Sequence, residues 1–298
     1  MKNSNQLKRM VLDGNNLVHR AFWVSKNQPS FNEHFHVYLF LNSVRTYVKL
    51  YEPDVVYCAW DEKANYQLNK RKELLEDYKG NRDKEKNKDV HTHNYIIKEL
   101  LEYLNIRNVC PYAYEADDVM AIFADQYKED EKVIITVDKD LCQLIDSKTV
   151  VYDPIRKIEF NDKNFEETLK CKKEEFVIIK ALAGDKSDNI PGLKGFGKVK
   201  IQKYLNGEIA FSVEEANQYA KNLKLMDLDH TLQNEIEVSY VVEQLNSCQQ
   251  GDFGKFKTRC KELGFHQILK KTSDWFNTFF FEALLKKSCF TNLSTLLQ

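Results

Sequence analysis

Met10-Val11-Leu12-Asp13-Gly14 is a short apolar run that ends in an aspartate and a glycine, the pattern of a buried strand followed by a turn. Two later stretches repeat this pattern. Val55–Trp60 runs into Asp61, and the β-branched stretch Val133–Val137 runs into Asp138. Strands that alternate with helical stretches are typical of a parallel sheet, so the sequence predicts an α/β fold with a mostly parallel central sheet flanked by helices.

Helical periodicity fills the intervals between these strands. Apolar residues at helical spacing predict helices over residues 35–51, 96–104 and 114–127, and a further strand is predicted over 106–110, before Pro111. In such sheets the ligand site lies beyond the carboxyl ends of the strands. The aspartates that follow the predicted strands are therefore candidate site residues.

The second part of the chain has a different pattern. From about Phe165 onward it is helical to the end, interrupted by a glycine-rich stretch over residues 184–197. We expect two domains, an α/β domain at residues 1–164 and a helical domain at residues 165–298.

The composition suits a globular protein, with 43% hydrophobic and 30% charged residues. No apolar stretch approaches the roughly 18 residues of a membrane span, and the polar N-terminus is no secretory signal. The seven cysteines are scattered without C-x-x-C spacing. This favours reduced thiols and a cytoplasmic location, in the host cytoplasm if the protein is viral. We expect no membrane contact and a monomer.

Net charge is close to neutral, at −1, which by itself argues weakly against a nucleic-acid binder. The average conceals local bias, because residues 193–205 hold four lysines and no acid. Acidic and basic regions that lie apart are what a metal-dependent phosphodiesterase needs.

Carboxylates follow the strands and open one helix, and some of them come in close pairs. Glu115 and Asp118 lie three apart and share a helical face, as like charges that raise each other's pKa. Oxygen ligands without His or Cys favour Mg²⁺ or Mn²⁺, and two such ions about 4 Å apart suit phosphoryl displacement. The alternative for any single aspartate is a helix cap or turn. The candidate metal ligands are Asp13, Asp61, Glu115, Asp117, Asp118, Asp138, Asp140, Asp185 and Asp188.

The stretch Asn189–Lys198 predicts a tight hairpin between two helices. Its glycines, Gly192, Gly195 and Gly197, lack the spacing of a dinucleotide-binding motif. They let the backbone approach a phosphate, and Lys198 and Lys200 add positive charge. Such contacts with the nucleic-acid backbone are independent of base sequence. The alternative is an ordinary helix–helix turn with solvated lysines.

Residues 62–88 form a long, charged segment that is functional or disordered in a compact domain. Tyr78 could stack on a base, and Lys79 and Arg82 could neutralise a phosphate. A solvated charged surface is the alternative. We interpret His91 and His93, the other metal-ligating residue types here, as part of a solvated turn.

These motifs resemble those of the structure-specific 5′ nucleases, which include flap endonucleases, the 5′ nuclease domain of bacterial DNA polymerase I and phage 5′-3′ exonucleases. The resemblance covers about residues 8–205, while 206–298 match only in helical character. It is closest to the stand-alone phage enzymes. The motifs, in the order of the family, are Val11-Leu12-Asp13-Gly14-Asn15-Asn16-Leu17, Trp60-Asp61, Tyr78–Arg82, Tyr114–Asp118, Thr136–Asp140 and Gly184–Gly197.

The resemblance implies a PIN-like sheet, a helical arch at about 63–94 and a helix-two-turn-helix at about 184–205, where K⁺ often sits. Lys79 and Arg82 would act on the scissile phosphate. The first metal would be served by Asp13, Asp61, Glu115, Asp117 and Asp118, and the second by Asp138, Asp140, Asp185 and Asp188. Asp138 is taken as a catalytic residue on this basis.

The function we expect is hydrolysis of phosphodiesters at 5′ flaps, junctions and 5′ ends of DNA, or in an RNA–DNA hybrid, in DNA replication or repair. A PIN-like ribonuclease and a non-catalytic module that binds branched DNA are the alternatives. The aromatic stretch over 275–281 could dock a single-strand-binding protein or a clamp, or could form a helical core face.

Overall fold

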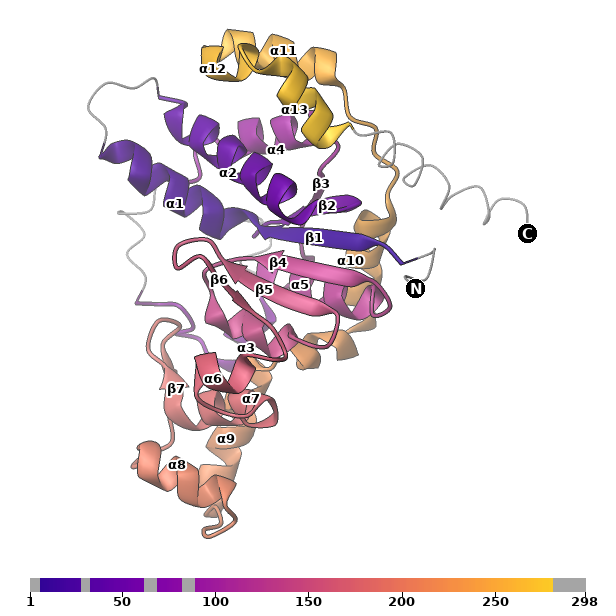
Figure 1. The fold of residues 1–298 in the computed structure, drawn as a ribbon. Coiled ribbons are helices and arrows are strands. Elements are labelled where there is room, and N and C mark those ends of the chain that lie inside the picture. Colours follow the sequence, from indigo (N-terminus) through magenta and orange to yellow (C-terminus); the bar gives the residue numbers. More distant parts are fainter. Residues whose placement is uncertain (1–5, 28–32, 62–68, 82–88, 281–298) are drawn as a thin grey trace.

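The structure, a computed structural model, describes residues 6–27, 33–61, 69–81 and 89–280 (Figure 1). Its centre is a six-stranded sheet of order β3-β2-β1-β4-β5-β6, in which every neighbouring pair is parallel except β5 with β6. The mostly parallel α/β sheet that the sequence predicts is confirmed. The strands are β1 Lys8–Asp13, β2 Val55–Ala59, β3 Arg107–Val109, β4 Glu131–Ile135, β5 Thr149–Asp153 and β6 Ile158–Phe160.

The last two strands were not predicted from the sequence. β5 alternates buried and half-buried residues and extends the sheet beside β4. β6 has only three residues and pairs antiparallel at the edge. Neither strand carries the continuous apolar run that marks the central ones, since edge positions bury less of each strand.

One face of the sheet packs on α1 (Gly14–Lys26), α2 (Phe35–Tyr51) and α4 (Asn94–Tyr103). Met10 and Leu12 point into this face, whereas Val11 between them points into the other, as the two-residue period of a strand requires. Figure 1 shows these helices together on one side of the sheet, with three C-terminal helices outside them. The C-terminal helices are α11 Phe253–Glu262, α12 His266–Leu269 and α13 Thr272–Phe279.

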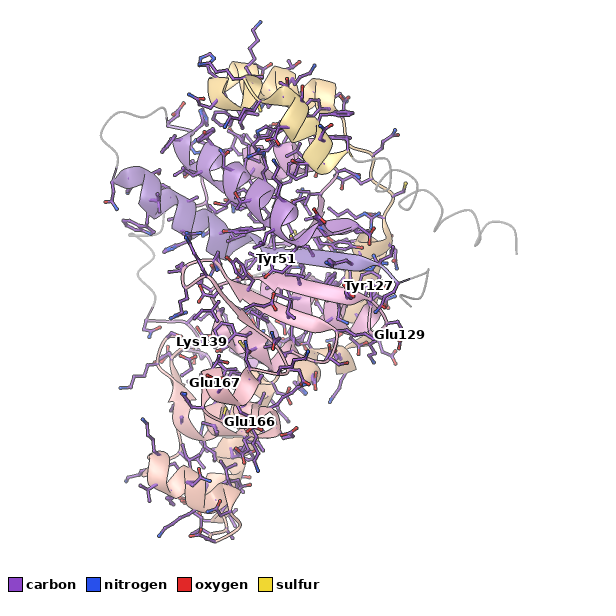
Figure 2. All side chains as sticks on the ribbon, viewed as in Figure 1. Tyr51, Tyr127, Glu129, Lys139, Glu166 and Glu167 are labelled. Atoms are coloured by element: carbon purple, nitrogen blue, oxygen red, sulfur yellow. The ribbon has the colours of Figure 1, made fainter. Side chains whose placement is uncertain are left out.

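The opposite face packs on α5 (Ala116–Gln126) and α10 (Glu235–Asn246), together with the 3₁₀ helices η2 (Lys139–Leu144) and η3 (Leu228–Gln233). The order of the strands reverses between β1 and β4, because the chain moves outward first on one side of β1 and then on the other. Such a reversal opens a crevice at the carboxyl ends of these two strands. In Figure 2, Lys139 lies near this end, while Tyr127 and Glu129 lie at the opposite end of the strands.

A smaller group of elements extends away from the sheet, at the lower part of Figure 1. It packs on its own apolar residues, which include Leu182, Leu193, Phe196 and Ile201. Its elements are α6 Phe165–Leu169, α7 Lys173–Ala183, β7 Gly184–Asp185, β8 Ile190–Pro191, α8 Lys198–Leu205 and α9 Val213–Met226.

The helical domain expected at residues 165–298 is therefore divided in the structure. Residues 165–226 form the extension, whereas α10 to α13 return to the sheet and cover both of its faces. The sequence carries no signal of this return, because the periodicity of a helix does not tell which surface it covers.

The expected arch at 63–94 falls partly outside the described residues. The described part contains α3 (Lys70–Leu74) and the turn that follows it, up to Asn81. α3 begins at Asn69, whose side chain accepts a hydrogen bond from the backbone of Arg71. No helix in the part of the chain that the structure describes is long and apolar enough to cross a membrane.

The aromatic C-terminal stretch belongs mainly to the core. Trp275 and Phe279 are 1% and 3% exposed and pack against Phe256 and each other. Phe276, on the opposite side of the helix, is 44% exposed. The helical core face that the sequence allowed for this stretch is what the structure contains, and Phe281 lies outside the described residues.

The packing of α13 predicts a large difference between adjacent aromatic residues. Trp275→Ala should lower the free energy of unfolding by about 3–5 kcal/mol, because it leaves a cavity in the core. Phe276→Ala should cost about 1 kcal/mol or less, as an exposed residue. Urea denaturation of both variants measures the difference. Equal losses would contradict the packing of α13 on α2.

Candidate active site

Asp13 lies at the reversal of the sheet order. It is the last residue of β1 and the N-cap residue of α1. Its carboxylate accepts hydrogen bonds from the backbone N–H of Asn16 at 3.1 Å and from Oγ1 of Thr136 at 2.7 Å. Burial raises the pKa of Asp13 to about 7, helped by repulsion from Asp61 and Asp138, and the two hydrogen bonds offset only part of the rise. Among the described residues, the charges that act most strongly on Asp13 are therefore other carboxylates.

Asp61 joins the end of β2 to the start of α5. Its Oδ1 accepts a hydrogen bond from the backbone of Ala116 at 2.8 Å, and its Oδ2 accepts one from the side chain of Asn15 at 3.1 Å. A carboxylate at the N-terminus of a helix is favoured by the helix dipole. Asp61 therefore contacts the first turn of α5, as a capping residue does, and also lies at the end of β2, where a site residue was expected.

Glu115 is the most heavily hydrogen-bonded carboxylate of the site. Burial raises its pKa, but the charges of Lys79 and Arg71 more than offset this and leave the pKa at about 2. It is therefore ionised at neutral pH. The donors to Glu115 are Nδ2 of Asn69 at 3.2 Å, a guanidinium nitrogen of Arg71 at 3.5 Å, the hydroxyl of Tyr78 at 2.7 Å and Nζ of Lys79 at 2.7 Å.

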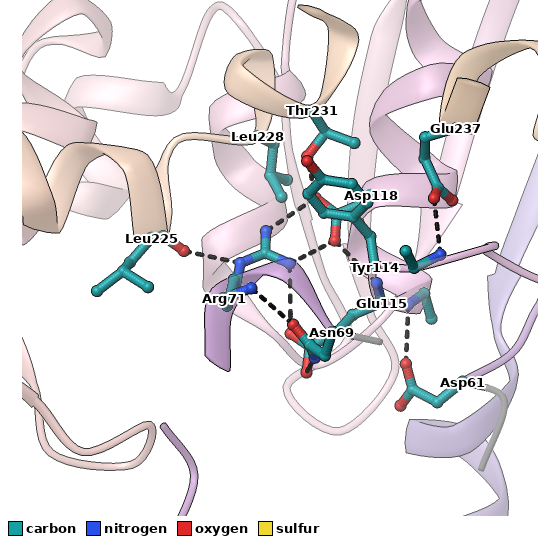
Figure 3. Close-up of polar contacts among 12 residues, drawn as sticks. Asp61, Asn69, Arg71, Tyr114, Glu115, Asp118, Leu225, Leu228, Thr231 and Glu237 are labelled. Atoms are coloured by element: carbon teal, nitrogen blue, oxygen red, sulfur yellow. Dashed lines mark hydrogen bonds and ion pairs between the residues drawn. The ribbon is translucent and has the colours of Figure 1, made fainter. Parts of the chain in front are cut away.

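Asp117 and Asp118 diverge at the start of α5. Burial and repulsion from Asp138 and Asp13 raise the pKa of Asp117 well above its usual value, so it faces the acidic cluster. Asp118 is completely buried, and its two oxygens accept hydrogen bonds from Arg71 and from the hydroxyl of Thr231 (Figure 3). The expectation that Asp118 serves a metal is corrected here, because its oxygens are already taken by protein donors.

The second group of carboxylates follows β4 and α7. Asp138 caps η2 and accepts a hydrogen bond from the backbone of Asp140 at 2.8 Å. Burial and repulsion from Asp138 raise the pKa of Asp140 to about 6, although Lys180 contacts it. In Asp185, burial is outweighed by hydrogen bonds from Ser187 and by the charge of Lys180, so its pKa is lowered.

Lys180 lies among these carboxylates, although no pattern in the sequence singled it out. It lies on α7, pairs with Asp140, and its Nζ is 3.6 Å from Oδ2 of Asp185. Lys79 bridges in the same way between Glu115, at 2.7 Å, and Asp188, at 3.8 Å. Each group of carboxylates thus holds an ammonium. A lysine on an amphipathic helix is normally solvated, so only the fold reveals the role of Lys180.

The donor set fits a hard divalent cation. All candidate ligands are carboxylate oxygens, and the raised pKa values of Asp13, Asp117 and Asp140 reflect repulsion that a cation would offset. Within residues 6–27, 33–61, 69–81 and 89–280, no three His, Cys, Asp or Glu side chains are arranged to enclose an ion. Lys79 and Lys180 draw the carboxylates toward their own ammonium groups instead.

Tyr78 is placed differently from expectation. Its ring is 3% exposed, and its hydroxyl donates to Glu115 at 2.7 Å and Asp188 at 3.2 Å. Base stacking by Tyr78 is therefore wrong for this structure, since the ring is packed inside the protein. Lys79, next to it, has a positive φ of 56°, which aims its side chain back into the site. Arg82 lies outside the described residues.

The glycine hairpin between α7 and α8 is confirmed, and its glycines differ in role. A Cβ on Gly192 would lie 2.2 Å from the carbonyl oxygen of Ala183, so this residue is required for close packing of the chain. Gly195, with φ of 78°, and Gly197 have no atom within 4 Å of an added Cβ. Their backbone is therefore open to an approaching ligand.

The two lysines proposed for this hairpin also differ. Lys198, at the start of α8, is exposed. Lys200 pairs with Glu215 at 2.9 Å and lies 4.0 Å over the ring of Phe196. Its charge is therefore shared with Glu215, and its contact with nucleic acid stays a prediction.

His93 lies in a turn, as predicted, but it is half-buried instead of solvated. It lies against two histidines at the start of α2, with Nδ1 of His93 at 3.3 Å from Nε2 of His36 and its ring 4.7 Å from that of His34. Burial lowers the pKa of His36 to about 4. The sequence separation of these residues hid the contact.

Comparison with known proteins gives the family. Residues 8–170 match the family model of the 5′-3′ exonuclease, N-terminal resolvase-like domain. A 5′-3′ exonuclease of Mycoplasmopsis pulmonis is 31% identical over 225 residues, which are 73% of this chain and 74% of that protein. DNA polymerase I of Caldicellulosiruptor bescii is 35% identical over 235 residues, which are 73% of this chain and 26% of the polymerase.

Solved structures share the fold. The T5 flap endonuclease crystallised with DNA and metal ions has a TM-score of 0.63 at 19% identity, over 80% of this chain and 98% of that one. A T5 protein of the same kind, crystallised with metal ions, has a TM-score of 0.61 at 21% identity, over 86% and 99%. On the match of its sequence over more than half of its length, the chain belongs to the 5′-3′ exonuclease family.

Proposed function

We propose that the protein is a Mg²⁺-dependent structure-specific 5′ nuclease that cuts phosphodiesters at 5′ flaps, junctions and 5′ ends of DNA in replication or repair. The observation that carries this proposal is the gathering of carboxylates at the reversal of the sheet order, next to a hairpin with open backbone. The relatives described as 5′-3′ exonucleases and the flap endonuclease with the same fold support it.

The metal would be held by carboxylates from two parts of the site. Mg²⁺, or Mn²⁺ in its place, would lower the pKa of a bound water and offset the charge that develops on the phosphate. The first ion would be served by Asp13, Asp61, Glu115 and Asp117, and the second by Asp138, Asp140, Asp185 and Asp188. Of these, Asp138 is an exposed residue that acts electrostatically on Asp13, and it is proposed to contact the reacting phosphate through its metal.

Cationic side chains would act on the substrate directly. Lys79 is held at the edge of the acidic cluster by Glu115 and Asp188, and its ammonium is proposed to neutralise the scissile phosphate. Arg82, three residues on, is proposed for the same role. When metal and phosphate bind, Lys79 and Lys180 would give up part of their ion pairs with the carboxylates.

Duplex DNA would be held away from the cut by the hairpin. Gly195 and Gly197 leave open space beside their Cα atoms, where the amides at the start of α8 would bind a phosphate, and Lys198 adds an exposed charge. A K⁺ ion at the 192–197 turn belongs to this proposal. The protein is proposed to act as a monomer in the cytoplasm, which the free thiols of the described cysteines support.

Two other functions are less well supported. A PIN-like ribonuclease acting on single strands would not need the hairpin, and a binding module would not need buried carboxylates at raised pKa. An RNA–DNA hybrid remains part of the proposed substrate range. Docking of a single-strand-binding protein or clamp by the C-terminal aromatics has little surface to use, since Trp275 and Phe279 are buried.

Cleavage of a 5′-end-labelled DNA flap tests the function. The flap should be released within about one nucleotide of the junction in Mg²⁺, and not in EDTA, because two-metal hydrolysis needs the ion. A matched single-stranded RNA serves as control. Degradation of the RNA alone would favour the ribonuclease, and tight binding of the flap without cleavage in saturating Mg²⁺ would favour the binding module.

The raised pKa values predict how Mg²⁺ stabilises the fold. Burial raises the pKa of Asp13 from 3.8 to about 7 and that of Asp140 to about 6, so the folded state binds protons that the unfolded state releases. Stability should therefore fall as the pH rises from about 4 to 7, and Mg²⁺ should restore it above that range. Melting temperatures should rise more with 10 mM Mg²⁺ at about pH 8 than at about pH 5.5.

The control for this experiment is Asp13→Asn. Without Mg²⁺ at pH 8 this variant should melt above the wild type, since it removes a buried charge that has no counter-cation. It should also gain less from Mg²⁺. An equal gain from Mg²⁺ at both pH values, in the wild type, would contradict a cation site at these carboxylates.

The hairpin predicts different salt dependences for its two lysines. Lys198→Ala should reduce the slope of log K for duplex binding against log salt by about 0.9, the value for one phosphate contact. Lys200→Ala should leave the slope nearly unchanged, because Lys200 is paired with Glu215. Fluorescence anisotropy in EDTA at several salt concentrations measures both. Equal slopes for wild type and Lys198→Ala would show that Lys198 does not contact the duplex, and the hairpin would then not be the duplex site.

A further inference from the structure

Arg71 is a buried arginine that contacts Glu115 and Asp118 (Figure 3). Its side chain is 6% exposed, and all three of its nitrogens have partners. Nε donates to the carbonyl oxygen of Leu225 at 2.8 Å, and the two terminal nitrogens donate to the two oxygens of Asp118 at 2.5 and 2.8 Å. One terminal nitrogen is also 3.5 Å from Glu115. This is a bidentate, planar arrangement that only an arginine makes.

These bonds join three segments that lie far apart in the sequence. Arg71 lies on α3, at the foot of the segment before Lys79, whereas Asp118 lies on α5 and Leu225 on α9. From the other side, Thr231 donates to Asp118, and Glu237 accepts from the backbone of Tyr112 and Ala113, just before Glu115. The start of α5 is therefore held between α3 and the elements that follow α9.

The same segment also supplies the donors to Glu115. Asn69, Tyr78 and Lys79 all reach that carboxylate, at 3.2, 2.7 and 2.7 Å. α3 carries Asn69 at its cap and Arg71 in its first turn, so a shift of Arg71 would move α3 and with it the donors that orient Glu115. The position of Lys79, in the turn after α3, depends on α3 in the same way.

A buried ion pair contributes little net stability, because the cost of removing two charges from water offsets most of their attraction. The bidentate geometry instead fixes the relative position of α3 and α5.

We propose that Arg71 is a positioning residue of the nuclease site. It acts through Glu115 and Asp118, and it orders the segment of residues 75–81 that follows α3, here called the Lys79 segment, without reaching the substrate. This inference rests on the proposed function, and its test separates the two.

The test compares Arg71→Lys with Arg9→Lys. Arg9 is a matched control, because it is also buried and paired, with Nε at 2.6 Å from Asp130, but it lies at the amino end of β1, away from the site. Lysine keeps the charge in both variants and removes the bidentate fork. The readouts are kcat and KM on the DNA flap, flap affinity in EDTA, and the Mg²⁺ concentration that gives half of the Mg²⁺-induced rise in melting temperature.

Arg71→Lys should lower kcat about tenfold to a hundredfold, the effect of a shift of about 1 Å in a site residue, and leave KM and flap affinity within about threefold. It should also raise the half-saturating Mg²⁺ concentration about fivefold or more, whereas Arg9→Lys should change neither quantity by more than about twofold. Equal effects of the two variants, or a normal kcat and Mg²⁺ dependence in Arg71→Lys, would overturn the inference.

A second variant keeps the test decisive if Arg71→Lys does not fold. Thr231→Val removes only the hydroxyl that contacts Asp118, and should lower kcat about threefold to tenfold at unchanged flap affinity. An unchanged kcat in Thr231→Val would then overturn the inference. If the wild type cleaves no flap, the proposed nuclease function fails, while the Mg²⁺ titration still decides whether Arg71 positions the carboxylates.

Discussion

Repulsion between carboxylates at the carboxyl ends of β1, β2 and β4 is the constraint on which the rest of the structure depends. The parallel sheet brings Asp13, Asp61 and Asp138 to one edge, and the reversal of strand order between β1 and β4 opens the crevice there. The pKa of Asp13 rises to about 7 as a consequence of burial and this repulsion. Part of the repulsion is offset, because cations from elsewhere in the chain pair with five other carboxylates of the site, Glu115, Asp118, Asp140, Asp185 and Asp188.

Those cations come from helices and turns outside the sheet. Arg71 lies on α3 and Lys79 in the turn that follows it, both before the acidic helix α5 in the sequence. Lys180 lies on α7 of the extension. Each pairs with two carboxylates or with both oxygens of one. Electrostatics thus draws α3, α7 and the turn at Asp188 to the carboxyl end of the strands, which is also where a metal-dependent site needs its second set of ligands and its cationic groups.

Much of this arrangement could be predicted from the sequence, and the remainder could not for definite reasons. Runs such as Met10–Leu12 identify central strands because both faces of such strands are buried, and the aspartate that follows then has a known place in a parallel sheet. Lys180 and Arg71 gave no signal, because a charged residue in a helical pattern is indistinguishable from a solvated one until its partner is known. Tyr78 was misassigned for the same reason, since Glu115, the carboxylate that accepts its hydrogen bond, lies on a different helix.

The hairpin and the Lys79 segment are tied to each other by three hydrogen bonds, and this tie sets the geometry of the site. The backbone of Lys79 donates to the carbonyl oxygen of Asp188 at 2.9 Å, the side chain of Asn81 donates to that of Lys186 at 2.6 Å, and the side chain of Asn189 donates to that of Asp77 at 3.0 Å. The loop between α7 and α8 therefore carries Asp185 and Asp188 near its start, where Lys79 and Asn81 contact it, and Gly195 and Gly197 near its end. Under the function proposed above, a duplex bound at the glycines would lie at one end of this loop and the carboxylates at the other. The loop would then convert the position of the duplex into the position of the cut.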